Sequence, residues 1–205
     1  EPVAKVSTET AVLAVAANSP YQTLEDFAAA AKEKKMKVGN SGNGSYTHLV
    51  SAAIADGLGV EFNHIPFGQG LAVTSLLGGQ IDASVQLPAE IMSQVQSGDV
   101  RILGATSQNR VNTLPDVPTF VEQGYDVVFE LWRGIAAPKG TPAEVIDVLE
   151  SAIEKATEEQ AFREKESDLV FQTTFASTEE FAQTIEEDHE KIGQIMETLG
   201  LKNNP

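Results

Sequence analysis

Short apolar segments that alternate with longer segments of helical spacing constrain the fold of this chain more than any other feature. Residues 12–16 form a continuous apolar run of strand length, and helical spacing follows at 24–34, where Thr23 has the residue type of an N-cap. Further strands are expected at 36–40, 61–67, 81–87 and 100–106, and further helices at 46–57, 71–77 and 89–96. Strands separated by helices of this length predict parallel crossover connections and therefore an α/β sheet.

The second part of the chain has a different pattern, which predicts a second structural region. Residues 112–118 are loop-like, a short helix is expected at 119–124, and 127–137 is an apolar stretch without helical period, long enough to run between two lobes. Thr141 is expected to cap a helix at 142–156, with Pro142 in its first turn. Helices at 159–166 and 178–199 flank a strand expected at 169–175.

Composition excludes several classes of protein. The chain has no cysteine, so disulfides, thiolate metal sites and cysteine nucleophiles are ruled out. With 30 acidic against 14 basic residues its formal net charge is −16, and a polyanionic nucleic acid or an anionic bilayer would repel it. No apolar run approaches the roughly 20 residues that a membrane helix needs. The first residues do not form a leader, and we expect that the chain begins after a segment that has been removed.

The strongest local signal is a glycine-rich turn between an expected strand and an expected helix. Glycines at such a turn let the backbone approach a ligand, and free N–H groups at a helix N-terminus favour an anion. Side-chain donors accompany the glycines. The candidate residues are Ser41, Gly42, Asn43, Gly44, Ser45, Tyr46, Thr47 and His48. The turn lacks both nucleotide-binding glycine patterns, and an ordinary strand-to-helix turn with a serine cap is the alternative.

Two more turns follow expected parallel strands. The first contains Phe67 and Gly68 within residues 66–70, and the second contains Gln86. Ligands of open α/β sheets bind beyond the carboxyl ends of the strands, so three such turns predict one binding edge. His48 could touch a ligand there from the first turn of its helix, although a capping or core role for it is equally open.

Trp132 and Arg133 form a further candidate pair. Trp132 is the only tryptophan, and Arg133 is a charged residue inside an apolar stretch. An arginine in that setting is normally paired or bound to a ligand. It could hold a ligand carboxylate, or it could pair with a nearby acid such as Glu130.

The sequence carries no pattern for catalysis, a metal or a cofactor. Its three histidines are far apart, without a metal-binding spacing. Its serines lack the G-x-S-x-G elbow of a hydrolase nucleophile. We therefore expect a binding protein rather than an enzyme, with no metal and no cofactor.

Several segments, taken in order, resemble the substrate-binding proteins of tripartite tricarboxylate transporters, the Bug-type receptors. Each is weak alone, but their joint order and spacing are specific and cover nearly the whole chain. The segments are Asn18-Ser19-Pro20, Gly42-Asn43-Gly44-Ser45, His64-Ile65-Pro66-Phe67-Gly68, residues 76–82 (LLGGQID), residues 114–119 (LPDVPT), Trp132-Arg133-Gly134 and residues 137–142 (APKGTP).

The resemblance implies a two-lobed type II periplasmic binding protein fold that closes on a small organic anion, such as a di- or tricarboxylate. It implies a periplasmic or cell-surface receptor that delivers its ligand to a pair of membrane permease subunits. The turn at residues 41–45, with Tyr46 and Thr47, would supply backbone and hydroxyl donors to a carboxylate. The turn with Phe67 and Gly68 would match the family's second loop in the same lobe.

The chain also departs from the family pattern. The second lobe, at 10–125, looks complete, whereas the first lobe is represented only by 1–9 and 126–205 and is incomplete at its N-terminus. Many members carry an acid and an amide where this chain has Gln86 and Leu87, which implies a different ligand choice. The alternative function is the effector-binding domain of a transcription regulator, which can share this fold.

Overall fold

The computed structural model describes residues 1–68, 71–166 and 170–201, which form two compact units. Unit 1 consists of residues 1–9 and 131–194. Unit 2 consists of residues 10–130 and the described residues from 195 onward. The sequence analysis expected a second lobe at 10–125 and a first lobe at 1–9 and 126–205.

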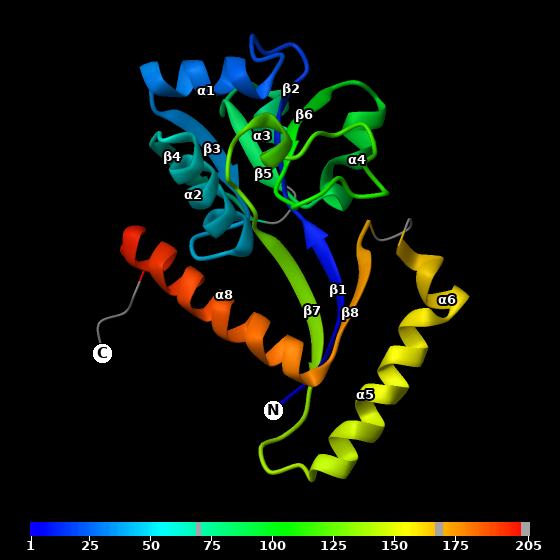
Figure 1. Ribbon diagram of the computed structural model, residues 1–205. Helices are drawn as coiled ribbons and strands as arrows, with labels where there is room; N and C mark the ends of the chain where they lie inside the picture. Colours follow the sequence, from blue (N-terminus) through cyan, green and yellow to red (C-terminus); the bar gives the residue numbers. More distant parts are fainter. Residues whose placement is uncertain (69–70, 167–169, 202–205) are drawn as a thin grey trace. The chain divides into compact units, whose positions relative to one another are not determined.

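Unit 2 is built on a five-stranded sheet in the order β4-β3-β5-β2-β6 (Figure 1). Its strands are β2 (Val12–Ala16), β3 (Met36–Asn40), β4 (Phe62–Pro66), β5 (Ala83–Gln86) and β6 (Val100–Ala105). Its helices are α1 (Leu24–Glu33), α2 (Tyr46–Leu58), α3 (Leu71–Leu77), α4 (Pro88–Gln96) and the short 3-10 helix η1 (Val121–Gln123). The α/β class predicted from the alternating pattern is therefore confirmed.

The direction of one strand differs from the prediction. β3 is parallel to both β4 and β5, as the crossover argument requires, but β2 is antiparallel to its neighbours β5 and β6. Apolar periodicity identifies a strand without fixing its direction, so the prediction of parallel crossovers fails for β2. Because of this direction, β2 begins at the edge where β5 and β6 end, and Val12 pairs with Gln86 and with Ala105.

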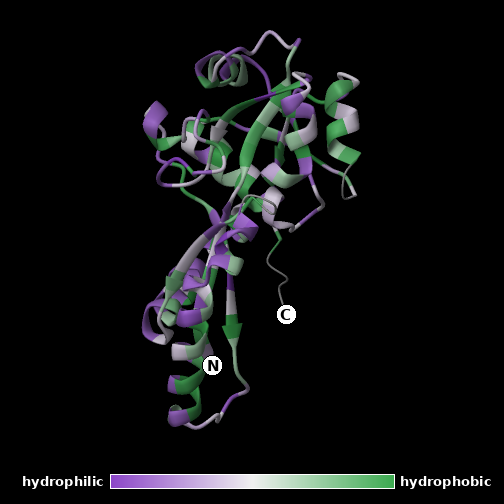
Figure 2. Cartoon of the chain, turned by 90° about the vertical axis from the view of Figure 1, so that its right-hand side faces the viewer, coloured by the Kyte–Doolittle hydropathy of each residue, from purple (hydrophilic) through white to green (hydrophobic). Residues whose placement is uncertain are grey.

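The core of unit 2 fills both sides of this sheet, because β2 and β3 are buried along most of their length. α1 begins with the expected cap: the Thr23 hydroxyl accepts from the Asp26 N–H, and the Asp26 carboxylate accepts from the Thr23 N–H. This capping box satisfies donors that a helix start leaves open. Hydrophobic residues concentrate in the strands and on one side of the helices (Figure 2). The largest fully buried side chains include Phe27, Phe120, Leu13, Leu24, Met36, Ile54, Leu76 and Ile91.

Unit 1 contains a three-stranded sheet in the order β7-β1-β8. Its elements are β1 (Pro2–Thr10), β7 (Glu130–Ala136), β8 (Gln172–Ala176), α5 (Ala143–Glu158), α6 (Gln160–Arg163) and α8 (Thr178–Thr198). Pro142, rather than the expected Thr141, occupies the cap position of α5. The strand expected from residue 169 starts outside the described residues and is described only as β8.

Packing in unit 1 centres on the contact between β7 and α8. Phe181 is 2% exposed, and its ring meets the Trp132 ring edge-on at a centroid distance of 5.0 Å. Gly134 leaves no room for a side chain, because a Cβ there would lie 2.2 Å from the Phe181 Cζ atom. Elsewhere this unit leaves apolar side chains uncovered, with Ile135 45% exposed on β7 and Val148 69% exposed on α5.

Candidate functional site

The turn at residues 41–45 joins the carboxyl end of β3 to α2, as the sequence predicted. Gly42 and Gly44 have φ values of +141° and +73°, which side-chain-bearing residues rarely adopt. Ser45 is the N-cap of α2, and its hydroxyl accepts from the His48 N–H at 3.3 Å. Glycine conformation and a serine cap therefore fix the shape of the turn.

Side chains hold three of the backbone N–H groups in this turn. Ser41 N–H donates to the Thr47 hydroxyl at 2.8 Å, and Gly44 N–H donates to His48 Nδ1 at 3.1 Å. The Thr47 hydroxyl in turn lies 3.1 Å from the Ser41 hydroxyl. In the described part of the chain, the N–H groups of Asn43 and Thr47 have no acceptor. Side-chain hydrogen bonds therefore make the turn rigid. The N–H groups of Asn43 and Thr47 remain as its open backbone donors.

Asn40 is a candidate that sequence reasoning missed. It is fully buried, and its Oδ1 atom accepts the third turn donor, the Gly42 N–H, at 3.0 Å. This bond fixes the orientation of the amide and leaves Nδ2 without a partner among the described residues. An unpaired buried donor is uncommon, so it marks a place for a ligand or water oxygen. Its position directly before the turn was the available signal.

The other two turns lie beside the first one. Phe67 N–H donates to the Asn40 carbonyl at 2.8 Å, and the Phe67 carbonyl lies 4.0 Å from where a Cβ of Gly42 would be. Gln86 is 2% exposed, and its amide donates to the Ser84 hydroxyl at 2.7 Å. Gly39 on β3 pairs with Ser84 on β5, so Gln86 ends the strand next to β3. The exposed Gly68 follows Phe67, while residues 69 and 70 of this predicted turn lie outside the described residues.

Tyr46 and two residues after β6 complete this edge of the sheet. The Tyr46 hydroxyl donates to the Phe129 carbonyl at 3.0 Å. Thr106 is fully buried, and the buried hydroxyl of Ser107 has no partner among the described residues. The sequence analysis did not single out Thr106 and Ser107, although both follow a strand end in the way that the three predicted turns do.

His48 and His64 form a small cluster, in which His48 is buried and His64 is half-buried. Their rings meet edge-on at a centroid distance of 4.8 Å, and His64 Nδ1 lies 3.1 Å from the Ser51 hydroxyl. Burial lowers the pKa of His48, and it lowers the pKa of His64 from 6.5 to about 4 with a smaller contribution from His48. Both rings are therefore neutral at pH 7, which suits His48 as the acceptor of the Gly44 N–H.

This cluster predicts a loss of stability in mild acid. Unfolded His64 takes up a proton below pH 6.5 and folded His64 only near pH 4, so the free energy of unfolding should fall as the pH decreases through that window. The expected loss is about 1–3 kcal/mol. Urea unfolding between pH 4 and 7 measures it. His64→Gln should flatten the profile and Ser51→Ala should preserve it, and an equal slope in His64→Gln and wild type would contradict the assignment.

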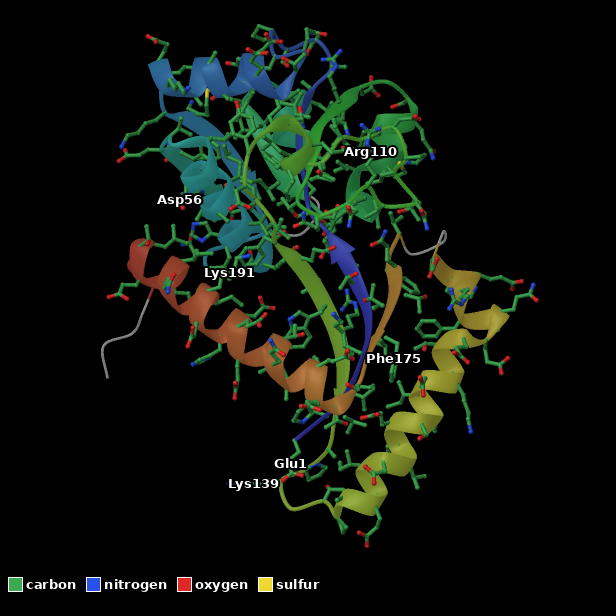
Figure 3. All side chains as sticks on the ribbon, in the orientation of Figure 1. Glu1, Asp56, Arg110, Lys139, Phe175 and Lys191 are labelled. Carbon is green, nitrogen blue, oxygen red and sulfur yellow. The ribbon has the colours of Figure 1, made fainter. Side chains whose placement is uncertain are left out.

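Two cationic side chains of unit 2 pair with acids away from the turn. Lys34 pairs with Asp82 at 2.9 Å. Arg110, labelled in Figure 3, holds Glu122 at 2.8 Å and also donates to the Pro115 carbonyl. Across the described residues of this unit, no lysine or arginine is bonded to the turn. The candidate site of unit 2 therefore offers neutral hydrogen-bond donors without a positive charge.

Trp132 and Arg133 belong to unit 1, where each has its own partner. Trp132 Nε1 donates to the Asp188 carboxylate at 2.5 Å. Arg133 donates from Nε and Nη2 to one oxygen of Glu9, both at 2.6 Å, instead of pairing with Glu130 as the sequence alternative suggested. The Arg133 side chain is 59% exposed and the Glu9 side chain 12% exposed. Among the described residues, the bonds of the guanidinium thus occupy one of its edges.

The described residues lack two features, a metal-binding cluster and a membrane-spanning helix. Within the described residues, no cluster of three or more histidine, cysteine or acidic side chains could hold a metal ion. No described helix combines the length and the apolar character that a membrane span requires.

The mixed α/β fold of this chain closely matches solved TctC and Bug periplasmic binding proteins. Residues 1–201 match the family model described as the tripartite tricarboxylate transporter family receptor, and the chain belongs to that family. The match favours the receptor interpretation over the effector domain of a transcription regulator.

Individual relatives agree with this assignment. A UPF0065 protein from Cupriavidus necator is 32% identical over 192 residues, which cover 92% of this chain and 58% of that protein. A ligand-free TctC solute-binding protein from Polaromonas has a TM-score of 0.86 and 37% identity, over 96% of this chain and 69% of its own. The fold is shared by MatC from Rhodopseudomonas palustris with bound malate, at a TM-score of 0.76 and 24% identity over 95% of this chain and 68% of its own. The chain thus spans about 58% of the Cupriavidus relative's length.

Proposed function

We propose that this chain is the greater part of an extracytoplasmic receptor that captures a small organic carboxylate. The observation that carries the proposal is that three strand-end turns lie along one edge of unit 2. The first of them, at residues 41–45, is held rigid by side-chain hydrogen bonds. A preorganised set of donors binds an anion without first having to be ordered. The family match and the malate in a structure of the same fold support the choice of a carboxylate.

A first carboxylate of the ligand is held at the turn. Its oxygens accept from the open N–H groups of Asn43 and Thr47, at the positive end of the α2 dipole. The side-chain amide of Asn40 offers a further donor, directly or through a water molecule. Gln86, Tyr46 and Phe67 line the same edge and set the shape of the ligand that fits.

A second carboxylate is held by Arg133. Glu9 uses the Nε and Nη2 side of the guanidinium, so Nη1 and the remaining Nη2 hydrogen stay available for a bidentate contact. Glu9 would then orient the arginine rather than compete for it. An arginine held in this way offers a positive charge to a carboxylate, and on this proposal it favours ligands with two or more carboxylates.

The proposed delivery to a membrane transporter is supported by the family match rather than by the site. Receptors of tripartite tricarboxylate transporters work outside the cytoplasmic membrane with permease subunits, and we propose the same role here. No step of this role requires catalysis or a cofactor.

Calorimetry on the protein in its full natural length tests the proposal with malate, succinate, adipate and citrate, and with acetate as a monocarboxylate. Gly44→Ala and Gly59→Ala form a matched pair, because both glycines have a left-handed φ, at +73° and +66°, and open space around a new Cβ. Each substitution should cost about 1 kcal/mol of stability. Only Gly44→Ala should weaken binding, by about fivefold or more, because it alone distorts the turn.

Two outcomes would overturn the proposed function. One is that none of the polycarboxylates binds to the wild-type protein. The other is that the Gly59→Ala substitution, at the far end of α2, weakens binding as much as Gly44→Ala does.

A further inference from the structure

We propose that the buried Thr106 side chain is a clasp that joins the two chain segments leading out of unit 2, and that Tyr46 links this clasp to the candidate ligand turn. Thr106 acts here as a positioning residue, without touching the ligand itself. The inference rests on the proposed function for its role in binding, but the clasp itself is a property of unit 2.

The backbone of Thr106 already contacts both segments. Its N–H donates to the Ala11 carbonyl at 2.9 Å, and its carbonyl accepts from the Phe129 N–H at 2.8 Å. Ala11 is the second residue of unit 2, and Phe129 stands one residue before its crossing to unit 1 at residues 130 and 131. One residue at the end of β6 therefore lies between the entry and the exit of this unit.

The hydroxyl of Thr106 repeats these contacts. It accepts from the Ala11 N–H at 3.2 Å, and it lies 2.7 Å from the Phe129 carbonyl and 3.2 Å from the Ala11 carbonyl. A hydroxyl has a single hydrogen to donate, and the shorter distance assigns that hydrogen to Phe129. The hydroxyl thus accepts from one segment and donates to the other. Because Thr106 is fully buried, no water can replace either bond without opening the structure.

Tyr46 extends the clasp to the ligand turn. Its hydroxyl donates to the same Phe129 carbonyl at 3.0 Å, and its ring lies 5.8 Å from the Phe129 ring. At the other end of α2, a Cβ on Gly57 would lie 2.2 Å from Val127 Cγ2, so this helix packs directly on residue 127. α2 therefore lies along the exit segment at both of its ends, and its first turn carries the candidate anion site.

This arrangement has a mechanical consequence. A ligand that shifts the start of α2 also shifts the Phe129 carbonyl, and with it the strand β7 that begins one residue later. Since Thr106 bonds both Ala11 and Phe129, the chain segments that enter and leave unit 2 move together rather than independently. Hinge residues are the few residues whose backbone dihedral angles change between open and closed forms. The clasp would confine these changes to residues that Thr106 does not hold.

Thr106→Val and Thr106→Ser separate the hydroxyl from the shape of the side chain. Valine keeps the branched shape and loses both hydroxyl bonds, whereas serine keeps the hydroxyl. Hydrogen exchange in the ligand-free protein is the first readout, because it needs no ligand. In Thr106→Val the Ala11 and Phe129 amides should exchange about tenfold faster than in wild type, and in Thr106→Ser they should exchange at nearly the wild-type rate. Unchanged exchange in Thr106→Val overturns the clasp.

Binding is the second readout, with malate as the probe and with ligand-induced compaction followed by small-angle scattering. Thr106→Val should weaken malate binding about fivefold and reduce the compaction, while both quantities in Thr106→Ser should stay close to wild type. The double variant Thr106→Val/Tyr46→Phe should lose less binding free energy than the sum of the two single losses, because both hydroxyls donate to the Phe129 carbonyl. Unchanged affinity with a lowered Tm would show that Thr106 only stabilises the fold. If malate does not bind to wild type while exchange responds as expected, the ligand assignment fails and the clasp stands.

Discussion

Replacing Arg133 with alanine is expected to weaken the binding of a dicarboxylate by about 2 kcal/mol, or roughly thirtyfold, and to affect a monocarboxylate much less. On the proposed function, a second carboxylate would lose its bidentate partner, whereas the contacts of the first carboxylate would remain. Titration calorimetry of both variants with malate and with acetate measures the difference.

Glu9→Gln is the matched control for this substitution. Glutamine keeps the size of the Glu9 side chain and removes its charge, so Arg133 stays in place with less of its charge compensated. Affinity for the dicarboxylate should then be retained or increased. Equal dicarboxylate affinity in wild type and Arg133→Ala would show that the Glu9 ion pair is the whole role of this arginine.

Gly134→Ala is expected to lower the free energy of unfolding by about 3 kcal/mol. The new methyl group would lie 2.2 Å from the Phe181 ring and 2.9 Å from the Ala4 carbonyl, and the second of these neighbours is backbone. The substitution would therefore separate β7 from α8 and disturb the edge-on contact of Trp132 with Phe181. Urea unfolding followed by tryptophan fluorescence reports on this contact, since Trp132 is the only tryptophan.

Gly193→Ala provides the contrast in the same unit. Gly193 lies within α8 with open space around a new Cβ, so alanine should raise stability by about 0.5–1 kcal/mol. If both glycine substitutions changed stability by the same amount and in the same direction, the packing between β7 and α8 would not be the cause.

Local patterns predicted the elements and the main turn, because their causes lie in adjacent residues. Gly42 and Gly44 directly after an apolar strand indicate a turn with unusual dihedral angles, and Ser45 indicates the helix start. Thr23 with Asp26 gave the start of α1 in the same way. These signals depend on a few neighbouring residues and not on how the rest of the chain folds.

Partners that are distant in the sequence could not be predicted in this way. Arg133 was given Glu130 as its alternative partner, yet residues three apart on a strand point to opposite sides of the sheet. Its observed partner Glu9 lies on β1, the strand next to β7. The role of Thr106 was missed for a similar reason, because its partners Ala11 and Phe129 are brought to it only by the folded sheet.

The continuous insertion of residues 10–130 within unit 1 predicts an order of folding. Most of unit 2 can form from one uninterrupted stretch of chain, whereas β1 must wait for β8, where Lys5 pairs with Ala176. Closing so long a loop is entropically costly for a flexible chain. A folded unit 2 removes most of that cost, because Ala11 and Phe129 are then both bonded to Thr106 and the chain ends that continue into β1 and β7 already lie close together. We therefore expect unit 2 to form first and the sheet of unit 1 to follow, so that damage to the strand ends of unit 2 should appear first as a failure of unit 1 to fold.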